Sequence, residues 1–128
     1  MGTYYKGGSP TYRSLRDNLL SVSENYVISS GGFFGKIGKA GVDEIRQIDV
    51  DDVLSEARKF YDDIAFGGIE TKLPNGKGVR TELRDGTIIV YREITTMVGS
   101  PAVEINVRKS IDNCGLKYHK IHFEKKGQ

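Results

Sequence analysis

The residue best suited to chemistry is His122, which lies near the carboxyl end of the chain in a segment that alternates polar and apolar side chains. A histidine can act as an acid or a base near neutral pH. Lys120 lies two positions earlier, on the same face if the segment is a strand. Metal-free RNA cleavage needs a base that activates the 2′-hydroxyl, a cation that stabilises the phosphorane, and an acid for the departing 5′-oxygen. The candidates for these roles are His122, Lys120, Arg108 and Glu104.

Further polar side chains are expected on the same open face, because successive side chains of a strand point to opposite faces of a sheet. Glu104 is the candidate base if His122 is the acid, and Tyr118 could stack on a nucleobase. The expected open face gathers Tyr118, Lys120 and His122 from the segment 116–124, and Glu104, Asn106 and Arg108 from the segment 102–108. An antiparallel sheet with one wet face always displays polar residues there, so the set by itself is compatible with a plain solvated surface.

The second histidine, His119, falls on the opposite face of the same segment, with Ile121, and is expected to be structural. Two histidines on opposite faces of a strand cannot bind one metal ion, and Cys114 is the only cysteine. No metal and no cofactor is therefore expected.

The phase of the segment 87–95 stays open. Ile88, Val90 and Ile94 favour one phase, but Arg92 would then point into the core. Either Arg92 reaches past an edge of the sheet or a bulge shifts the alternation. Arg92 is a weaker catalytic candidate for that reason.

Two helices are expected to cover the other face of the sheet. Leu15, Leu19 and Val22 have near-helical spacing after Ser9 and Pro10. The segment 31–41 is rich in glycine and predicts a loop, whose lysines could follow a phosphate backbone but more simply belong to a flexible linker. Asp49 is the expected cap of a second helix over 50–66, with an apolar stripe of Val53, Ala57, Phe60 and Ile64.

The rest of the chain predicts four strands. Asp85 and Gly86 favour a tight hairpin between the first two. Helices come first and strands follow, which is an α+β layout with N-terminal helices packed on one face of a four-stranded antiparallel sheet. We expect residues 1–30 to form a helical, partly ordered segment and residues 31–128 the main domain. The four expected strands are 78–84, 87–95, 102–108 and 116–124.

Composition adds little about the partner. The chain has 128 residues, enough for one core, and its 19 basic and 17 acidic side chains leave a net charge of only +2. Acidic residues concentrate between Asp43 and Asp63, and basic ones dominate the second half. No stretch has the length and apolarity of a membrane span.

Four short motifs resemble the C-terminal toxin domains of bacterial polymorphic toxins, including contact-dependent growth inhibition effectors. The motifs cover about the last two thirds of the chain, and many of their residues are typical of turns. They are Leu73-Pro74-Asn75-Gly76-Lys77-Gly78, Asp85-Gly86-Thr87-Ile88-Ile89-Val90-Tyr91-Arg92, Gly99-Ser100-Pro101-Ala102-Val103-Glu104-Ile105 and Lys120-Ile121-His122-Phe123.

This resemblance implies a barnase-like fold, of the barnase, EndoU, colicin and RelE group, that cleaves RNA and often tRNA. It implies a monomeric toxin, secreted or surface-delivered within a larger protein, that acts in the cytoplasm of a target bacterium. An immunity protein, expected to be acidic, would neutralise it. Carried over by position, the resemblance implies His122, Arg92 and Ser100 as site residues. The candidate substrate-binding residues are Tyr118, Ser100, Lys77 and Asn106.

Two alternatives to a metal-independent ribonuclease remain. The same sheet could serve a non-catalytic RNA-binding or protein-interaction module. A metal-dependent DNase is less favoured, because the expected open face has few clustered carboxylates. Asp51, Asp52, Asp62 and Asp63 belong to the predicted helix, where capping and solvation explain them.

Overall fold

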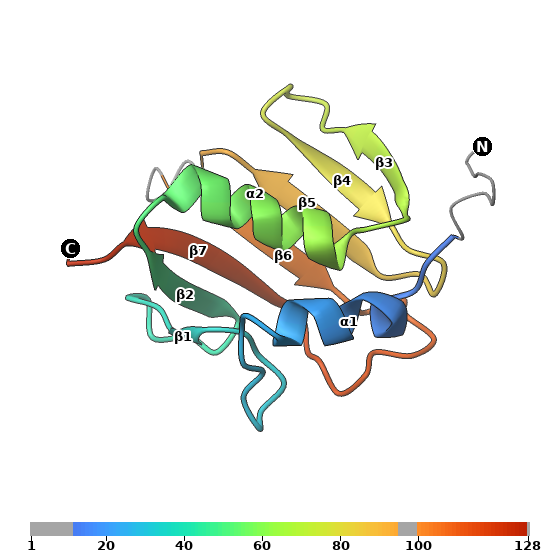
Figure 1. The fold of residues 1–128 in the computed structure, drawn as a ribbon, viewed down its shortest axis with the longest axis horizontal. Coiled ribbons are helices and arrows are strands. Elements are labelled where there is room, and N and C mark those ends of the chain that lie inside the picture. Colours follow the sequence, from blue (N-terminus) through green and yellow to red (C-terminus); the bar gives the residue numbers. More distant parts are fainter. Residues whose placement is uncertain (1–11, 95–99, 128) are drawn as a thin grey trace.

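One mixed sheet of seven strands, covered on one face by two helices, makes up the fold (Figure 1). The computed structural model describes residues 12–94 and 100–127. The strand order across the sheet is β1-β2-β7-β6-β5-β4-β3. The elements in chain order are α1 (Leu15–Ser23), β1 (Lys36–Ile37), β2 (Ile45–Val50), α2 (Val53–Ile64), β3 (Ile69–Lys72), β4 (Gly78–Glu82), β5 (Ile88–Arg92), β6 (Ala102–Asn106) and β7 (His119–Lys125).

The expected four-stranded antiparallel sheet behind N-terminal helices, and the barnase-like layout with it, are wrong. The four predicted strands correspond to β4, β5, β6 and β7, but three more strands extend the sheet at both sides. The last strand, β7, lies in the interior of the sheet and pairs in parallel with β2. Since α2 follows β2 in the chain, the helices do not precede the sheet.

The missed strands lack the signals that mark a strand in a sequence. All four residues of β3 are exposed, so this edge strand has no buried face to produce an alternating pattern. β1 has only two residues, in the glycine-rich segment expected to be a loop. In β2, Arg46 is buried on the helix-covered side with Ile48 and Val50, which breaks the apolar alternation.

The second helix is shorter at both ends than the predicted 50–66, and Val50, its expected first residue, is the last residue of β2. The side chain of Asp52, rather than that of Asp49, caps α2 by accepting from the Ser55 N–H. The apolar stripe is confirmed for Ala57, Phe60 and Ile64, which are fully buried. α2 crosses the sheet diagonally and contacts β2, β5, β6 and β7 (Figure 1).

The first helix begins at Leu15, with Ser14 and Asp17 forming a capping box. Leu15 and Val22 belong to the same buried cluster as the apolar residues of α2 and the sheet. Asp85 fastens the start of α1 to the β4–β5 turn, because its carboxylate accepts from the Leu15 N–H and from the Thr87 and Ser110 hydroxyls. The described part of the expected N-terminal segment, residues 12–30, thus contributes to the common core.

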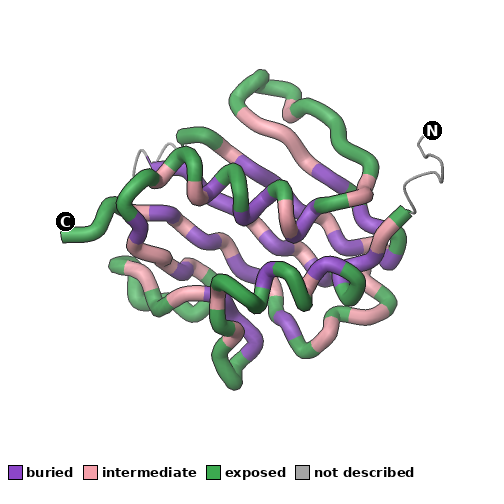
Figure 2. Tube along the Cα trace, viewed as in Figure 1, coloured by how far each residue is buried: buried purple, intermediate pink, exposed green. Residues whose placement is uncertain are grey.

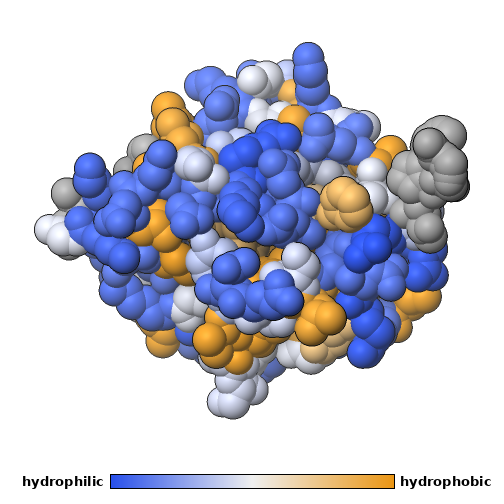
Figure 3. Space-filling model, viewed as in Figure 1, coloured by the Kyte–Doolittle hydropathy of each residue, from blue (hydrophilic) through white to orange (hydrophobic). Residues whose placement is uncertain are grey.

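The core lies between the helices and the sheet, where buried positions alternate along the strands (Figure 2). Val103 and Ile105 of β6 and Ile121 and Phe123 of β7 are fully buried there, as predicted. The outer side of the helix layer is mostly hydrophilic, with scattered apolar residues (Figure 3). In the described ranges 12–94 and 100–127, no helix has the length and apolar character needed to cross a membrane.

The structure also answers the phase question for the strand that carries Arg92. Ile89 and Tyr91 of β5 face the helices and are buried. Arg92 therefore lies on the open face, together with Ile88 and Val90. Of the phases left open, the one with Ile88 and Val90 toward the helices does not occur, and Val90 is buried on the open side of the sheet.

Candidate functional site

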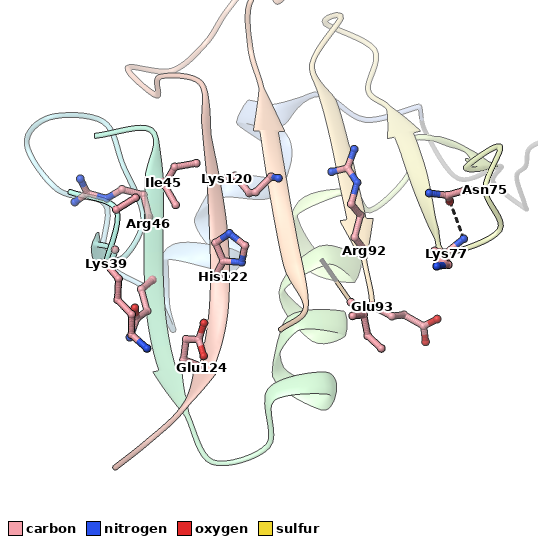
Figure 4. A pocket seen from close by; sticks show the side chains of 14 residues that line it. Lys39, Ile45, Arg46, Asn75, Lys77, Arg92, Glu93, Lys120, His122 and Glu124 are labelled. Atoms are coloured by element: carbon pink, nitrogen blue, oxygen red, sulfur yellow. Dashed lines mark hydrogen bonds between the residues drawn. The ribbon is translucent and has the colours of Figure 1, made fainter. Parts of the chain in front are cut away.

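A pocket of about 650 Å³ opens on the face of the sheet opposite the helices, and His122 lies in its middle (Figure 4). Its ends are formed by the β1–β2 loop, with Lys39, and by the β3–β4 turn, with Asn75 and Lys77. Five basic and two acidic residues are among those that line it, although the side chain of Arg46 lies on the helix-covered side of the sheet. The complete lining is Gly38, Lys39, Ala40, Ile45, Arg46, Gln47, Asn75, Lys77, Arg92, Glu93, Ile94, Lys120, His122 and Glu124.

The sheet register explains why these side chains meet. His122 pairs with Ala102 of β6, and Ala102 pairs with Arg92 of β5, so all three share one face. On the other side, Gln47 of the parallel strand β2 lies beside His122. His122 and Arg92 are two strands apart, a spacing of roughly 10 Å. Only the small side chain of Ala102 separates them in this row.

His122 is half-buried, and its ring is held by a neighbouring serine. Its Nδ1 lies 3.3 Å from Ser100 Oγ, which in turn donates to Glu124 Oε2 at 3.1 Å. Among the described residues, no side chain or backbone group hydrogen-bonds to Nε2 of His122. This nitrogen is therefore available to a ligand in the pocket.

Burial lowers the pKa of His122 below its ordinary value, and the Lys120 ammonium lowers it further, while the Glu124 carboxylate opposes the shift. The imidazole is consequently neutral at pH 7. A neutral imidazole can accept a proton, whereas an imidazolium could only donate one.

A second polar cluster adjoins the pocket around Glu104. Its Oε1 accepts from Arg92 Nη1 at 3.0 Å, and its Oε2 accepts from the Tyr118 hydroxyl at 2.9 Å. Arg108 stacks on the Tyr118 ring, with its guanidinium carbon 3.9 Å from the ring centre. Burial, helped by the bond to Glu104, raises the pKa of Tyr118, so its hydroxyl stays protonated. Both oxygens of Glu104 are thus engaged.

The structure brings together only part of the predicted set. His122, Lys120, Arg92 and Lys77 line the pocket, and Ser100 lies behind His122. Glu104, Tyr118 and Arg108 form the adjoining cluster. Asn106 lies at the end of β6, where its side-chain oxygen accepts from the Arg108 N–H, and it does not line the pocket.

Sequence reasoning missed most of the lining residues as site residues, and three of them show why. Glu124 lies two positions after His122, and the alternation that selected Lys120 and Tyr118 could have selected it too. Gln47 could not have been found, because β2 was not predicted. Lys39 was considered for contact with a phosphate backbone but assigned to a flexible linker; the pairing of β1 with β2 places its loop at the rim of the pocket.

The other histidine, His119, has the surroundings of a structural residue. His119 is fully buried on the helix-covered side, with its ring against Phe33 and Phe34. Nε2 accepts from the Phe34 N–H at 3.1 Å, and Nδ1 donates to the Lys117 carbonyl at 2.8 Å. Burial lowers its pKa to about 4. In the ranges 12–94 and 100–127, no group of three or more histidine, cysteine or acidic side chains could hold a metal ion.

Comparison with known proteins does not extend this description. No protein-family model matches the chain, and no solved structure matches it. The function is therefore argued from the pocket itself.

Proposed function

We propose that this chain is a metal-independent endoribonuclease whose substrate binds in the pocket around His122. The observation that carries the proposal is a neutral, half-buried imidazole with an available Nε2, set among the basic side chains of Lys39, Lys77, Arg92 and Lys120. A base surrounded by cations suits a reaction in which an alcohol is deprotonated beside a phosphate.

The reaction is a transesterification within the RNA strand. His122 removes the proton of a 2′-hydroxyl, and the oxygen attacks the adjacent phosphorus. The new bond joins the 2′-oxygen to phosphorus and the bond from phosphorus to the 5′-oxygen breaks, which leaves a 2′,3′-cyclic phosphate and a 5′-hydroxyl. The departing oxygen takes a proton from water, and His122 returns its own proton to solvent.

Lys120 is a cation whose charge acts on the proposed base, since it lowers the pKa of His122. It lies two residues from His122 on the same face of β7, a separation of roughly 7 Å between the two positions. A phosphate held between these side chains would place its negative oxygens beside the ammonium group. Lys120 thus stabilises the charge that develops on the phosphorane.

The rest of the pocket supports a strand that crosses the sheet. Lys39 and Lys77 lie at its opposite ends (Figure 4). β2 and β4 are four strand spacings apart, which corresponds to roughly 20 Å, or several nucleotides. A single strand of RNA laid across β7 would contact a basic side chain at both ends and the proposed base in the middle.

The biological setting follows from the motifs that resemble bacterial toxin domains. We propose that the ribonuclease is a toxin delivered into the cytoplasm of a target bacterium, with tRNA as its substrate. A cognate immunity protein with an acidic surface would bind over the basic pocket and block it. Binding of the immunity protein should weaken when Lys39 and Lys77 are both changed to glutamine.

The test is incubation of purified protein with total RNA in the presence of EDTA. We expect cleavage, and we expect His122→Ala to reduce its rate by about 10²- to 10⁴-fold, the usual contribution of a general base. Lys120→Gln should also slow cleavage strongly. Lys59→Gln removes an equal charge from the exposed face of α2 and should leave the rate unchanged.

A defined oligonucleotide sharpens the result. A single 2′-deoxy substitution at the cleavage position should abolish cutting there, because the attacking hydroxyl is missing. Intact RNA that nonetheless binds the protein would refute the enzyme and favour a binding module. Cutting of the deoxy-substituted strand, or of plasmid DNA on addition of magnesium, would refute the 2′-hydroxyl chemistry.

A further inference from the structure

A serine connects His122 to a carboxylate that the proposed reaction has not used. Ser100 lies just before β6, and only 8% of its surface is exposed. Its Oγ is 3.3 Å from His122 Nδ1 and 3.1 Å from Glu124 Oε2. Glu124 and His122 are two residues apart on β7, so both side chains stand on the open face.

The protons available to these groups fix the direction of both hydrogen bonds. A serine hydroxyl has one proton to donate, and an ionised carboxylate can only accept. Ser100 therefore donates to Glu124, and its oxygen accepts from His122. The neutral imidazole then carries its proton on Nδ1, so that Nε2 has the free lone pair.

We infer that Ser100 and Glu124 are positioning residues that hold His122 in the tautomer with the proton on Nδ1 and Nε2 free to act as the base. The role of Nε2 in RNA cleavage rests on the proposed function, but the tautomer does not. This chain of hydrogen bonds, the relay of Glu124, Ser100 and His122, leaves Nε2 without a proton, so that His122 acts as the base rather than the acid. Glu104, the other candidate base, has both oxygens engaged by Arg92 and Tyr118.

The order of the three residues differs from that of a serine hydrolase. In such a triad the histidine lies between the serine and the acid, so that the histidine accepts the serine proton. Here the serine lies between the histidine and the acid, and its proton is directed to Glu124. The relay orients an imidazole and does not activate Ser100 as a nucleophile.

Several charged groups face His122, including Glu124 of the relay. On β7 these are Lys120 and Glu124, which have opposite effects on its protonation. Arg92 on β5 is paired with Glu104 on β6, and Asp49 on β2 is paired with Lys36. Since these two ion pairs are internally neutralised, Lys120 and Glu124 are the charges to whose loss the titration of His122 should respond, and loss of the Glu124 charge should lower the pKa of His122.

Nuclear magnetic resonance of protein with isotope-labelled histidine tests the tautomer directly, because the nitrogen and ring-carbon shifts differ between the two forms. The chain has only two histidines, and His119 is an internal reference for the same tautomer, since its Nδ1 donates to the Lys117 carbonyl. Above its pKa, His122 should carry its proton on Nδ1. A proton on Nε2 in the unmodified protein would overturn the inference.

Four substitutions separate the relay from a general structural effect. Ser100→Ala should shift His122 toward the other tautomer and leave the His119 signals unchanged, while Ser100→Thr keeps the hydroxyl and should retain the tautomer. Glu124→Gln still accepts from Ser100, so the tautomer should persist while the titration of His122 moves to lower pH. Glu82→Gln removes an exposed charge on β4 and should leave that titration unchanged. An unaltered tautomer in Ser100→Ala would refute the relay.

Cleavage kinetics then distinguish the relay from the proposed function. If the protein cuts RNA, Ser100→Ala should lower kcat by about 10- to 100-fold with little change in KM, and the acidic limb of the pH profile should move to lower pH in Glu124→Gln. If the unmodified protein shows the expected tautomer but does not cut RNA, the relay stands and the ribonuclease assignment fails.

Discussion

Acid should destabilise the fold through His119, well above the pH at which carboxylates titrate. In the folded protein His119 is fully buried and its pKa is lowered to about 4, whereas an exposed histidine in the unfolded chain titrates near 6.5. Between these values the unfolded state binds more protons than the folded state. Stability is therefore fully present above pH 6.5 and falls as the pH drops toward 4.

The size of the effect follows from the difference between the two pKa values. A single group with this difference lowers the free energy of unfolding by about 2 kcal/mol between pH 7 and pH 5, and by about 3 kcal/mol between pH 7 and pH 4. The physical cause is that a protonated Nε2 can no longer accept from the Phe34 N–H, and the charge would lie between Phe33 and Phe34. A loss of 2 kcal/mol should shift the urea midpoint by about 1 M.

Urea unfolding followed by far-ultraviolet circular dichroism at a series of pH values measures this slope. The background should be His122→Ala, because the pKa of His122 is also lowered and would add to the slope. In that background His119→Gln is the matched variant, since the glutamine carbonyl oxygen can accept from the Phe34 N–H but does not titrate. The slope between pH 4 and 6.5 should largely disappear. An equal slope with and without His119 would refute the reasoning.

Two further predictions concern the cluster beside the pocket and the core. Glu104→Gln should change the cleavage rate by less than tenfold, because Glu104 holds Arg92 and Tyr118 rather than taking the substrate proton; a loss of 10²-fold or more, with binding retained, would make Glu104 the base. Phe60→Ala should lower the free energy of unfolding by about 3–5 kcal/mol in urea titrations, since its ring is fully buried, whereas Phe66→Ala, with 61% of its surface exposed, should cost well under 1 kcal/mol; equal losses would contradict the assigned core.

Strand alternation predicted much of the site because a buried face forces a period of two. The core residues Ile121 and Phe123 fixed the phase of β7, and that phase separated His122 from His119. The same argument failed on β5, where Val90 is apolar but lies on the open face, so apolar side chains occurred at consecutive positions. Alternation predicts a face only where a single face is buried.

Pairings between distant segments could not be predicted in this way. Four strands, β3 to β6, lie between β2 and β7 in the chain, and nothing local in the acidic segment around Asp49 indicates a parallel partner. Helix capping was the more economical interpretation of Asp49, Asp51 and Asp52, and Asp52 does cap α2. Asp49 instead pairs with Lys36 of β1 at the edge of the sheet.

The sequence alone determined the local features of this protein: the amphipathic helix α2, the tight turn between β4 and β5, and the open-face positions of Lys120 and His122. These depend on side-chain periodicity and turn residues, which are properties of short segments. Only the tertiary structure decided that β2 lies beside β7, that the loop with Lys39 closes one end of the pocket, and that Ser100 joins His122 to Glu124. These contacts depend on how segments far apart in the chain share one buried core, and no short stretch of residues encodes that arrangement.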